Sequence, residues 1–149
     1  MRMRFDRWAV HAAGVALVTV IGFTVPHAQE KPTVKRVPAQ PIASVEGVDS
    51  YREYCAVCHG SDARGSGPAA RALKIPPSDL TRIAQRNGGK FPTEQVRGVI
   101  LGDAQVPAHG ERDMPIWGKV FRSFGGPDDQ THKLRVQNLV KYLESLQVK

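Results

Sequence analysis

The sequence predicts an all-α domain in which short helices are joined by long loops. Residues 45–56 and 131–147 each place apolar side chains on one face at helical spacing, and no segment shows the alternating pattern of a strand. The chain also holds 14 Gly and 11 Pro, which favour turns and keep helices short. With 149 residues, 41% of them hydrophobic, it is long enough for one compact domain with a modest core.

Residues 1–28 have the composition of a secretory signal peptide. Three arginines precede an apolar run from Trp8 to Val25, the order that such signals require. We expect cleavage before Gln29 or, as a second candidate, after Ala39. The apolar run is also almost long enough to remain as a membrane anchor, although a histidine within it weakens that interpretation. Both versions predict export of the remaining chain, and we expect it in the periplasm.

Residues 29–43 are predicted to form an extended, Pro-rich linker. They carry Pro32, Pro38 and Pro41 among lysine, glutamine and alanine, and their apolar residues follow no period. The folded domain is therefore expected to occupy residues 44–149.

The first helix of the domain is predicted over residues 45–56, with Ser44 as a candidate N-cap. Its apolar face consists of Val48, Tyr51, Tyr54 and Cys55. Residues 60–80 are rich in glycine and proline and are expected to form a loop with one helical turn at Ala69–Leu73.

Three further short helices are expected before the last one. Thr81–Asn87 is closed by two glycines, and Pro92–Leu101 is stopped by Gly102. Residues 103–130 are expected to be mainly loop, apart from a helix over Trp117–Phe124.

The last helix gives the clearest pattern. Thr131 is its candidate N-cap, and Asp128 and Asp129 suit the positive end of its dipole. The predicted inner stripe consists of Val136, Leu139, Val140, Leu143 and Leu146. The predicted outer face carries Lys133, Arg135, Lys141 and Glu144.

The charge of the chain excludes one class of partner. The formal net charge is +7, and without the leader 18 Lys and Arg stand against 13 Asp and Glu. This excess indicates a mildly basic soluble surface, or a patch that steers docking onto an acidic protein. The basic residues are scattered and have no interleaved aromatic residues, so we expect no nucleic-acid binding.

The chain has only two cysteines, and both lie in the motif Cys55-Ala56-Val57-Cys58-His59. Cys-x-x-Cys-His is the pattern of covalent haem attachment: two thiols add to the two vinyl groups of the porphyrin, and the histidine reaches the iron. A zinc site would need a second Cys or His pair, but His109 and His132 are single and far apart. A dithiol centre usually accompanies a βαβ unit, which the sequence does not predict. We therefore expect one haem c.

Met114 is the candidate for the sixth iron ligand. It is the only methionine after the leader, and it lies 55 residues after His59 in the segment Asp113-Met114-Pro115. A neutral thioether opposite a histidine raises the haem potential. The alternatives are a buried methionine that fills a gap and ligation by His109, which would lower the potential.

These residues resemble the class I cytochrome c family, in particular its small bacterial members. The resemblance covers roughly Val45–Gln147. The motifs that carry it are Cys55–Gly60, Gly65-Ser66-Gly67-Pro68, Pro76-Pro77-Ser78-Asp79-Leu80 and Met114-Pro115-Ile116-Trp117-Gly118. The first and last motifs together are specific, whereas the Gly-Pro loop alone is weak. The resemblance implies a fold of short helices and long loops wrapped around one haem.

The resemblance also implies roles for single residues. Gly47 and Tyr51 on the first helix would pack against Tyr142 on the last. The carbonyl of Pro77, with Pro76 as the alternative, would hold the second nitrogen of His59. Trp117 would pack on the haem edge, donate its N–H to a propionate, or serve only as core.

The sequence therefore predicts an exported one-electron carrier rather than an enzyme, since both axial positions of the iron are filled by protein. Its expected partners are redox proteins that donate and accept electrons in transient docking. Two alternatives stay open. One is an electron-relay subunit anchored to a membrane oxidoreductase. The other is an open-site haem sensor or peroxidase-like protein, which would need Met114 to be absent from the iron or labile.

Overall fold

A computed structural model describes residues 33, 35, 37–103, 114–126 and 129–148. By its contacts the chain divides into residues 1–30 and 31–149, and every described residue belongs to the second unit. The predicted leader, residues 1–28, lies outside the described residues. Within the described ranges, no helix combines the length and apolar character that crossing a membrane demands.

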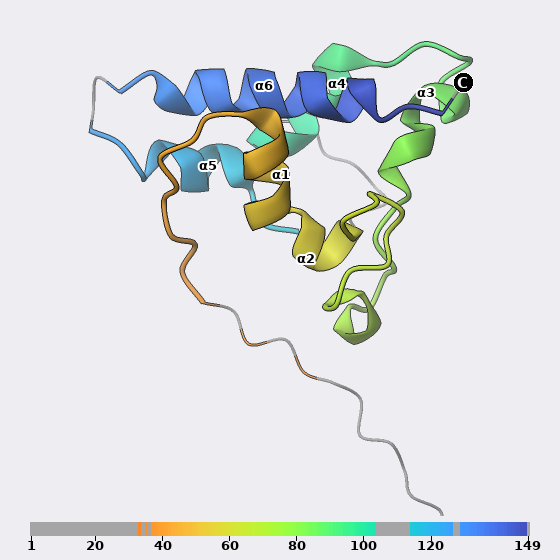
Figure 1. Cartoon of the computed structure of the whole chain (residues 1–149), viewed down its shortest axis with the longest axis horizontal. Coiled ribbons are helices and arrows are strands. Elements are labelled where there is room, and N and C mark those ends of the chain that lie inside the picture. Colours follow the sequence, from red (N-terminus) through yellow and green to blue (C-terminus); the bar gives the residue numbers. More distant parts are fainter. Residues whose placement is uncertain (1–32, 34, 36, 104–113, 127–128, 149) are drawn as a thin grey trace, which may run out of the picture. The chain divides into compact units, whose positions relative to one another are not determined.

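The described residues form helices, 3-10 turns and loops without a strand, which confirms the all-α prediction (Figure 1). In chain order the elements are α1 (Gly47–Tyr54), α2 (Ala56–His59), the 3-10 turns η1 (Ala70–Ala72) and η2 (Leu80–Arg82), α3 (Ile83–Arg86), α4 (Thr93–Leu101), α5 (Trp117–Arg122) and α6 (Thr131–Ser145). Most are short, as the glycine and proline content predicts.

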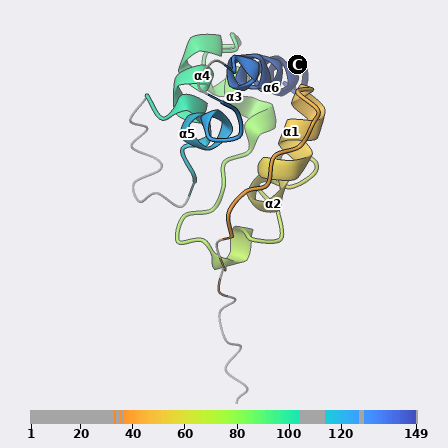
Figure 2. The same ribbon diagram turned by 90° about the vertical axis from the view of Figure 1, so that its left-hand side faces the viewer.

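Helix α6 organises the domain, because α1, α4 and α5 all pack against it (Figures 1 and 2). Figure 2 looks nearly along α6 and shows these three helices around it. The predicted stripe is confirmed: four of its residues are at most 5% exposed, and Leu146 packs against them. The four are Val136, Leu139, Val140 and Leu143.

Two details of α6 differ from the prediction. Arg135 was expected on the outer face, but it is only 4% exposed. Its long side chain reaches carbonyl groups beyond the helix, which a spacing argument cannot detect. Thr131 is the first helical residue rather than the N-cap. The N-cap is Gln130, whose side chain makes no capping hydrogen bond, and the backbone N–H of Thr131 donates to Oδ1 of Asp129 at 2.7 Å instead.

The crossing of α1 over α6 depends on Gly47. A Cβ atom at this position would lie 2.2 Å from the carbonyl oxygen of Asn138 and 2.7 Å from Cβ of Tyr142. One turn later, the rings of Tyr51 and Tyr142 lie 5.4 Å apart between centroids. The packing expected for Gly47, Tyr51 and Tyr142 is therefore present, and it brings the first turn of α1 close to α6.

The segment before α1 departs from the predicted linker. Ala39 and Ile42 pack against the core, and the carbonyl of Gln40 accepts a hydrogen bond from Tyr54. The folded unit thus begins before residue 44. Ser44 does not cap α1, whose N-cap is Glu46. Instead Ser44 Oγ donates to a carboxylate oxygen of Asp49 at 2.6 Å and accepts from the N–H of Glu46.

The remaining short helices follow the expected boundaries closely. Gly102 ends α4 in the left-handed conformation, with φ at 81°. The helix predicted at Thr81–Asn87 is divided into η2 and α3, and Asp79 caps η2 by accepting a hydrogen bond from the N–H of Thr81. The expected helical turn near Ala69 is η1. Of the segment 103–130, residues 104–113 and 127–128 lie outside the described residues.

The buried hydroxyl of Tyr51 makes the stability of the fold depend on pH. It is fully buried, and its hydroxyl donates to the carbonyl of Gly60 at 2.7 Å. Burial, with smaller contributions from Cys55 and other neighbours, raises the pKa of Tyr51 above its ordinary value. The folded chain therefore holds the phenol proton more tightly than the unfolded chain. That contribution to stability is complete below about pH 10 and is lost as the pH rises through the folded-state pKa.

We expect the free energy of unfolding to fall above about pH 10, and Tyr51→Phe to remove part of that fall. At neutral pH the variant should lose about 1–2 kcal/mol, because the Gly60 carbonyl loses its donor. Urea unfolding at pH 7 and at pH 10–11, followed by circular dichroism, measures both effects. A variant with the same decline as its parent would contradict the assignment.

Candidate functional site

A cavity of about 300 Å³ lies between residues 78–86 on one side and helices α4, α5 and α6 on the other. Small-molecule sites usually span about 300–1,000 Å³, so the volume is at the lower end of that range. Its wall brings together Cys55, His59 and Met114, although Met114 is far from the other two in sequence. The apolar lining consists of Leu80, Ile83, Pro92, Val96, Val99, Ile100, Trp117, Leu139 and Leu143.

His59 is fixed at one side of this cavity. It is 7% exposed, and its Nδ1 lies 3.1 Å from the carbonyl oxygen of Ser78. A carbonyl can only accept, so Nδ1 must carry the proton, and Nε2 keeps the lone pair that a metal requires. The contact was predicted for Pro77. It belongs to the next residue, since the Pro77 carbonyl oxygen faces Gly65 instead, 2.2 Å from where a Cβ there would lie.

The Gly-x-Gly-Pro loop holds the backbone of the cysteine motif through hydrogen bonds. The N–H groups of Gly65, Gly67 and Ala69 donate to the carbonyls of His59, Cys58 and Val57 at 2.7–3.1 Å. A Cβ on Gly67 would lie 2.5–2.6 Å from two carbonyl oxygens of α2, so only glycine allows this approach. The loop thereby fixes the backbone that carries both cysteines and the histidine.

The two cysteines differ in their relation to the cavity. Cys55 lines the cavity, whereas Cys58 is not part of that lining; both are partly buried. Burial raises the pKa of the Cys55 thiol to about 12, and the nearby Cys58 adds to this effect. At neutral pH the Cys55 thiol is therefore protonated, and it is directed at apolar surroundings that suit a hydrophobic ligand.

Met114 faces the same cavity from the start of the segment that leads into α5. It is partly buried against the core. The segment is anchored at two glycines: a Cβ on Gly102 would lie 2.4 Å from Ile116, and one on Gly118 would lie 2.8 Å from Cα of Leu101. The end of α4 thus packs against Ile116 and Gly118, which follow Met114 in the chain. The competing ligand His109 lies outside the described residues.

Trp117 contributes both to the cavity wall and to an aromatic cluster. It is 9% exposed, and its ring centroid lies 5.3 Å from that of Tyr54 and 5.6 Å from that of Phe121. Trp117 therefore packs in the core, while its contact with a bound group stays a prediction.

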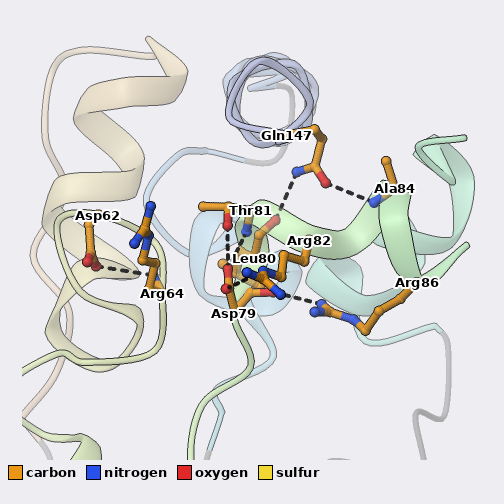
Figure 3. A network of polar contacts seen from close by, with 9 residues as sticks. All are labelled: Asp62, Arg64, Asp79, Leu80, Thr81, Arg82, Ala84, Arg86 and Gln147. Carbon is orange, nitrogen blue, oxygen red and sulfur yellow. Dashed lines mark hydrogen bonds and ion pairs between the residues drawn. The ribbon is translucent and has the colours of Figure 1, made fainter. Parts of the chain in front are cut away.

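The sequence interpretation missed a set of polar contacts that involve Leu80 and Arg86, two residues of the cavity lining (Figure 3). The side chain of Gln147 donates to the carbonyl of Leu80 at 2.8 Å and accepts from the N–H of Ala84 at 2.8 Å. Arg86, which lines the cavity, donates to the carbonyl of Asp79 at 2.7 Å. Hydrogen bonds from Thr81 hold the pKa of Asp79 below its ordinary value.

These residues left no signal that a sequence pattern could reveal. Gln147 follows Leu146, the last residue of the apolar stripe, where a polar residue is ordinary, and Arg86 is the exposed last residue of α3. The apolar lining was easier to find, because Val96 and Ile100, and Leu139 and Leu143, are four residues apart on one helical face.

Comparisons with family models, with curated proteins and with solved structures found no match. Within the described residues, no three His, Cys, Asp or Glu side chains converge as ligands for a metal ion. The site is therefore interpreted from its own geometry: one imidazole, one thioether and one cysteine around an apolar cavity.

Proposed function

We propose that this protein is an exported c-type cytochrome with one haem, which carries single electrons between redox proteins. The observation that carries the proposal is the placement of Cys55, His59 and Met114 around one apolar cavity. Two of these residues belong to a haem-attachment motif, and the third has the side chain that pairs with histidine in carriers of high potential. We further propose the fold of class I cytochromes c.

Haem attached at Cys55 and Cys58 would supply an iron that changes its charge by one unit. The residues of this chain fit such a group. His59 presents Nε2 because its Nδ1 donates to Ser78, which also fixes the orientation of the ring. Met114 would supply the second protein ligand of the iron and would leave no position for a substrate. The apolar wall would exclude water, which keeps the rearrangement that accompanies electron transfer small.

The partners follow from this chemistry. A carrier must release each partner quickly, so we propose small, transient interfaces with one electron donor and one acceptor. Periplasmic location is proposed from the leader-like residues 1–28. If that leader stays attached, the same domain would be the electron-relay subunit of a membrane oxidoreductase. Mass spectrometry of the mature N-terminus distinguishes the two.

The test is a redox titration of the purified protein followed by absorption. We expect a low-spin spectrum in both oxidation states and a near-infrared thioether charge-transfer band in the ferric state. Met114→Ala should abolish that band, because the mature chain has no other methionine. Leu134→Ala, at a side chain 46% exposed on α6, is the matched control and should keep it. A high-spin ferric spectrum of the unmodified protein would overturn the carrier and favour an open-site sensor or peroxidase.

A further inference from the structure

Arg135 is a buried cation, and its hydrogen-bond acceptors among the described residues are all neutral. Its guanidinium donates to the carbonyls of Ile42 (2.9 Å) and Ser44 and to Oγ of Ser50 (3.2 Å). The guanidinium carbon also lies 5.7 Å from the ring centroid of Phe121. Burying a charge is costly, and an aliphatic side chain would serve the packing of α6 at least as well. The explanation for a buried arginine at this position lies in the carbonyls of Ile42 and Ser44 that it binds.

The two carbonyls belong to residues 39–45, which we call the strap. Arg135 connects the strap to α6 across more than 90 residues of sequence with two hydrogen bonds, and Asn138 adds a third from the same helix by donating to the carbonyl of Val45 at 3.0 Å. The planar fork of an arginine can hold two carbonyls at once, whereas a lysine provides a single point of attachment. Arg135 therefore fixes the course of the strap as well as its presence.

The strap in turn holds Tyr54. The N–H of Ile42 donates to the Tyr54 hydroxyl at 3.2 Å, and that hydroxyl donates to the carbonyl of Gln40 at 2.9 Å. The Tyr54 side chain is 4% exposed, and its ring centroid lies 5.3 Å from that of Trp117. Both hydrogen-bonding capacities of the hydroxyl are thus used by the strap, which sets the orientation of the ring against Trp117.

Tyr54 connects the cysteine motif to the segment that carries Met114. It directly precedes Cys55, and its neighbour Trp117 lines the cavity three residues after Met114. A tilt of the Tyr54 ring would therefore be transmitted through packed side chains to the segment that carries Met114, because aromatic cores have little free volume.

We propose that Arg135 and Tyr54 are positioning residues for Met114, acting through the strap and Trp117. The proposal rests on the proposed function and extends it: the strap determines how readily the thioether leaves the iron. While Arg135 holds the strap, the packed rings of Tyr54 and Trp117 keep Met114 and the residues that follow it against the cavity. With the strap loosened, an added ligand displaces Met114 more easily.

The test uses the complete holoprotein with four variants: Arg135→Met, Arg135→Lys, Tyr54→Phe and, as control, Lys133→Met on the exposed face of α6. Imidazole is added to the ferric protein, and loss of the near-infrared thioether band gives its affinity. We expect Arg135→Met and Tyr54→Phe each to raise the affinity about fivefold, the effect of one hydrogen bond of ordinary net strength. Arg135→Lys should lie between, and Lys133→Met should match the parent.

A purely structural role would give a different result. It would lower the urea midpoint of the Arg135 variants and leave the imidazole affinity unchanged, which would overturn the proposal. Tyr54→Phe keeps the ring and removes only the hydroxyl, so it decides the question even if Arg135→Met fails to fold.

A second readout is independent of the iron. Amide exchange at Ile42 should be faster in Arg135→Met than in Lys133→Met, because the bond to Tyr54 loosens with the strap. Equal exchange would overturn the strap's attachment through Arg135. A high-spin ferric spectrum of the unmodified protein would overturn the proposed function. A low-spin spectrum without the thioether band, or a band with unchanged imidazole affinity in the variants, would overturn only the positioning role.

Discussion

Replacing Cys55 and Cys58 together by alanine is expected to give a chain that carries no haem and forms no stable helix. The cavity beside Cys55 measures about 300 Å³ and touches α4, α5 and α6. Without haem, the apolar wall of this cavity loses the group that it would pack against, and unfilled apolar space costs stability. A domain of this size is stable by only roughly 5–15 kcal/mol, so the loss of packing along three helices is expected to remove much or all of its stability.

The measurement is far-ultraviolet circular dichroism of the double variant, with heating to detect a cooperative transition. Val57→Ala is the matched control, because it changes the same motif at a side chain that is 48% exposed. The control should retain haem, helix and cooperative unfolding. A double variant that unfolds cooperatively with full helix content would refute the prediction, since the helices would then need no cofactor between them.

Gly47→Ala is expected to have the next largest effect. The added methyl group would lie 2.2 Å from a backbone oxygen of α6, and the backbone of a helix cannot yield as a side chain can. Overpacking of this kind costs about 1–3 kcal/mol, and we expect the upper end because α1 must move as a unit. That movement would also displace Tyr51 from Tyr142 and shift the end of α1 that adjoins Cys55.

Urea unfolding of the haem-loaded protein measures this loss. Gly126→Ala is the control, since a Cβ at Gly126 would meet no atom of the described residues within 4 Å apart from its chain neighbours. Its stability should differ from that of the parent by less than about 0.5 kcal/mol. If Gly47→Ala were as stable as Gly126→Ala, the close crossing of α1 and α6 would not be a determinant of the fold.

Local patterns predicted the helices because their causes are local. The stripe of α6 repeats every three or four residues, so burial of Val136, Leu139 and Val140 follows from helical geometry alone. The end of α4 could also be predicted, because Gly102 adopts a backbone conformation that other residues avoid. The candidate site was found for a similar reason, since the spacing of its cysteines and histidine is short and specific.

Contacts between distant segments could not be predicted in this way. Arg135 has the same spacing as an exposed residue, and only the approach of residues 42 and 44 makes it a buried donor. The partner of His59 shifted from Pro77 to Ser78 because the turn geometry between them decides which carbonyl faces the ring. Residues 39–43 resembled a linker in composition, yet Tyr54 and the core hold them.

The sequence by itself determined the helical class, the stripe of α6 and the chemical groups of the site: two thiols, one imidazole and one thioether. These are properties of residue type and short spacing. Only the tertiary structure decided that Cys55, His59 and Met114 share one cavity, that glycines permit the close approach of helices and loops, and that Arg135 fastens the strap. Such features depend on which distant backbones come within a few ångströms, and no local pattern encodes that distance.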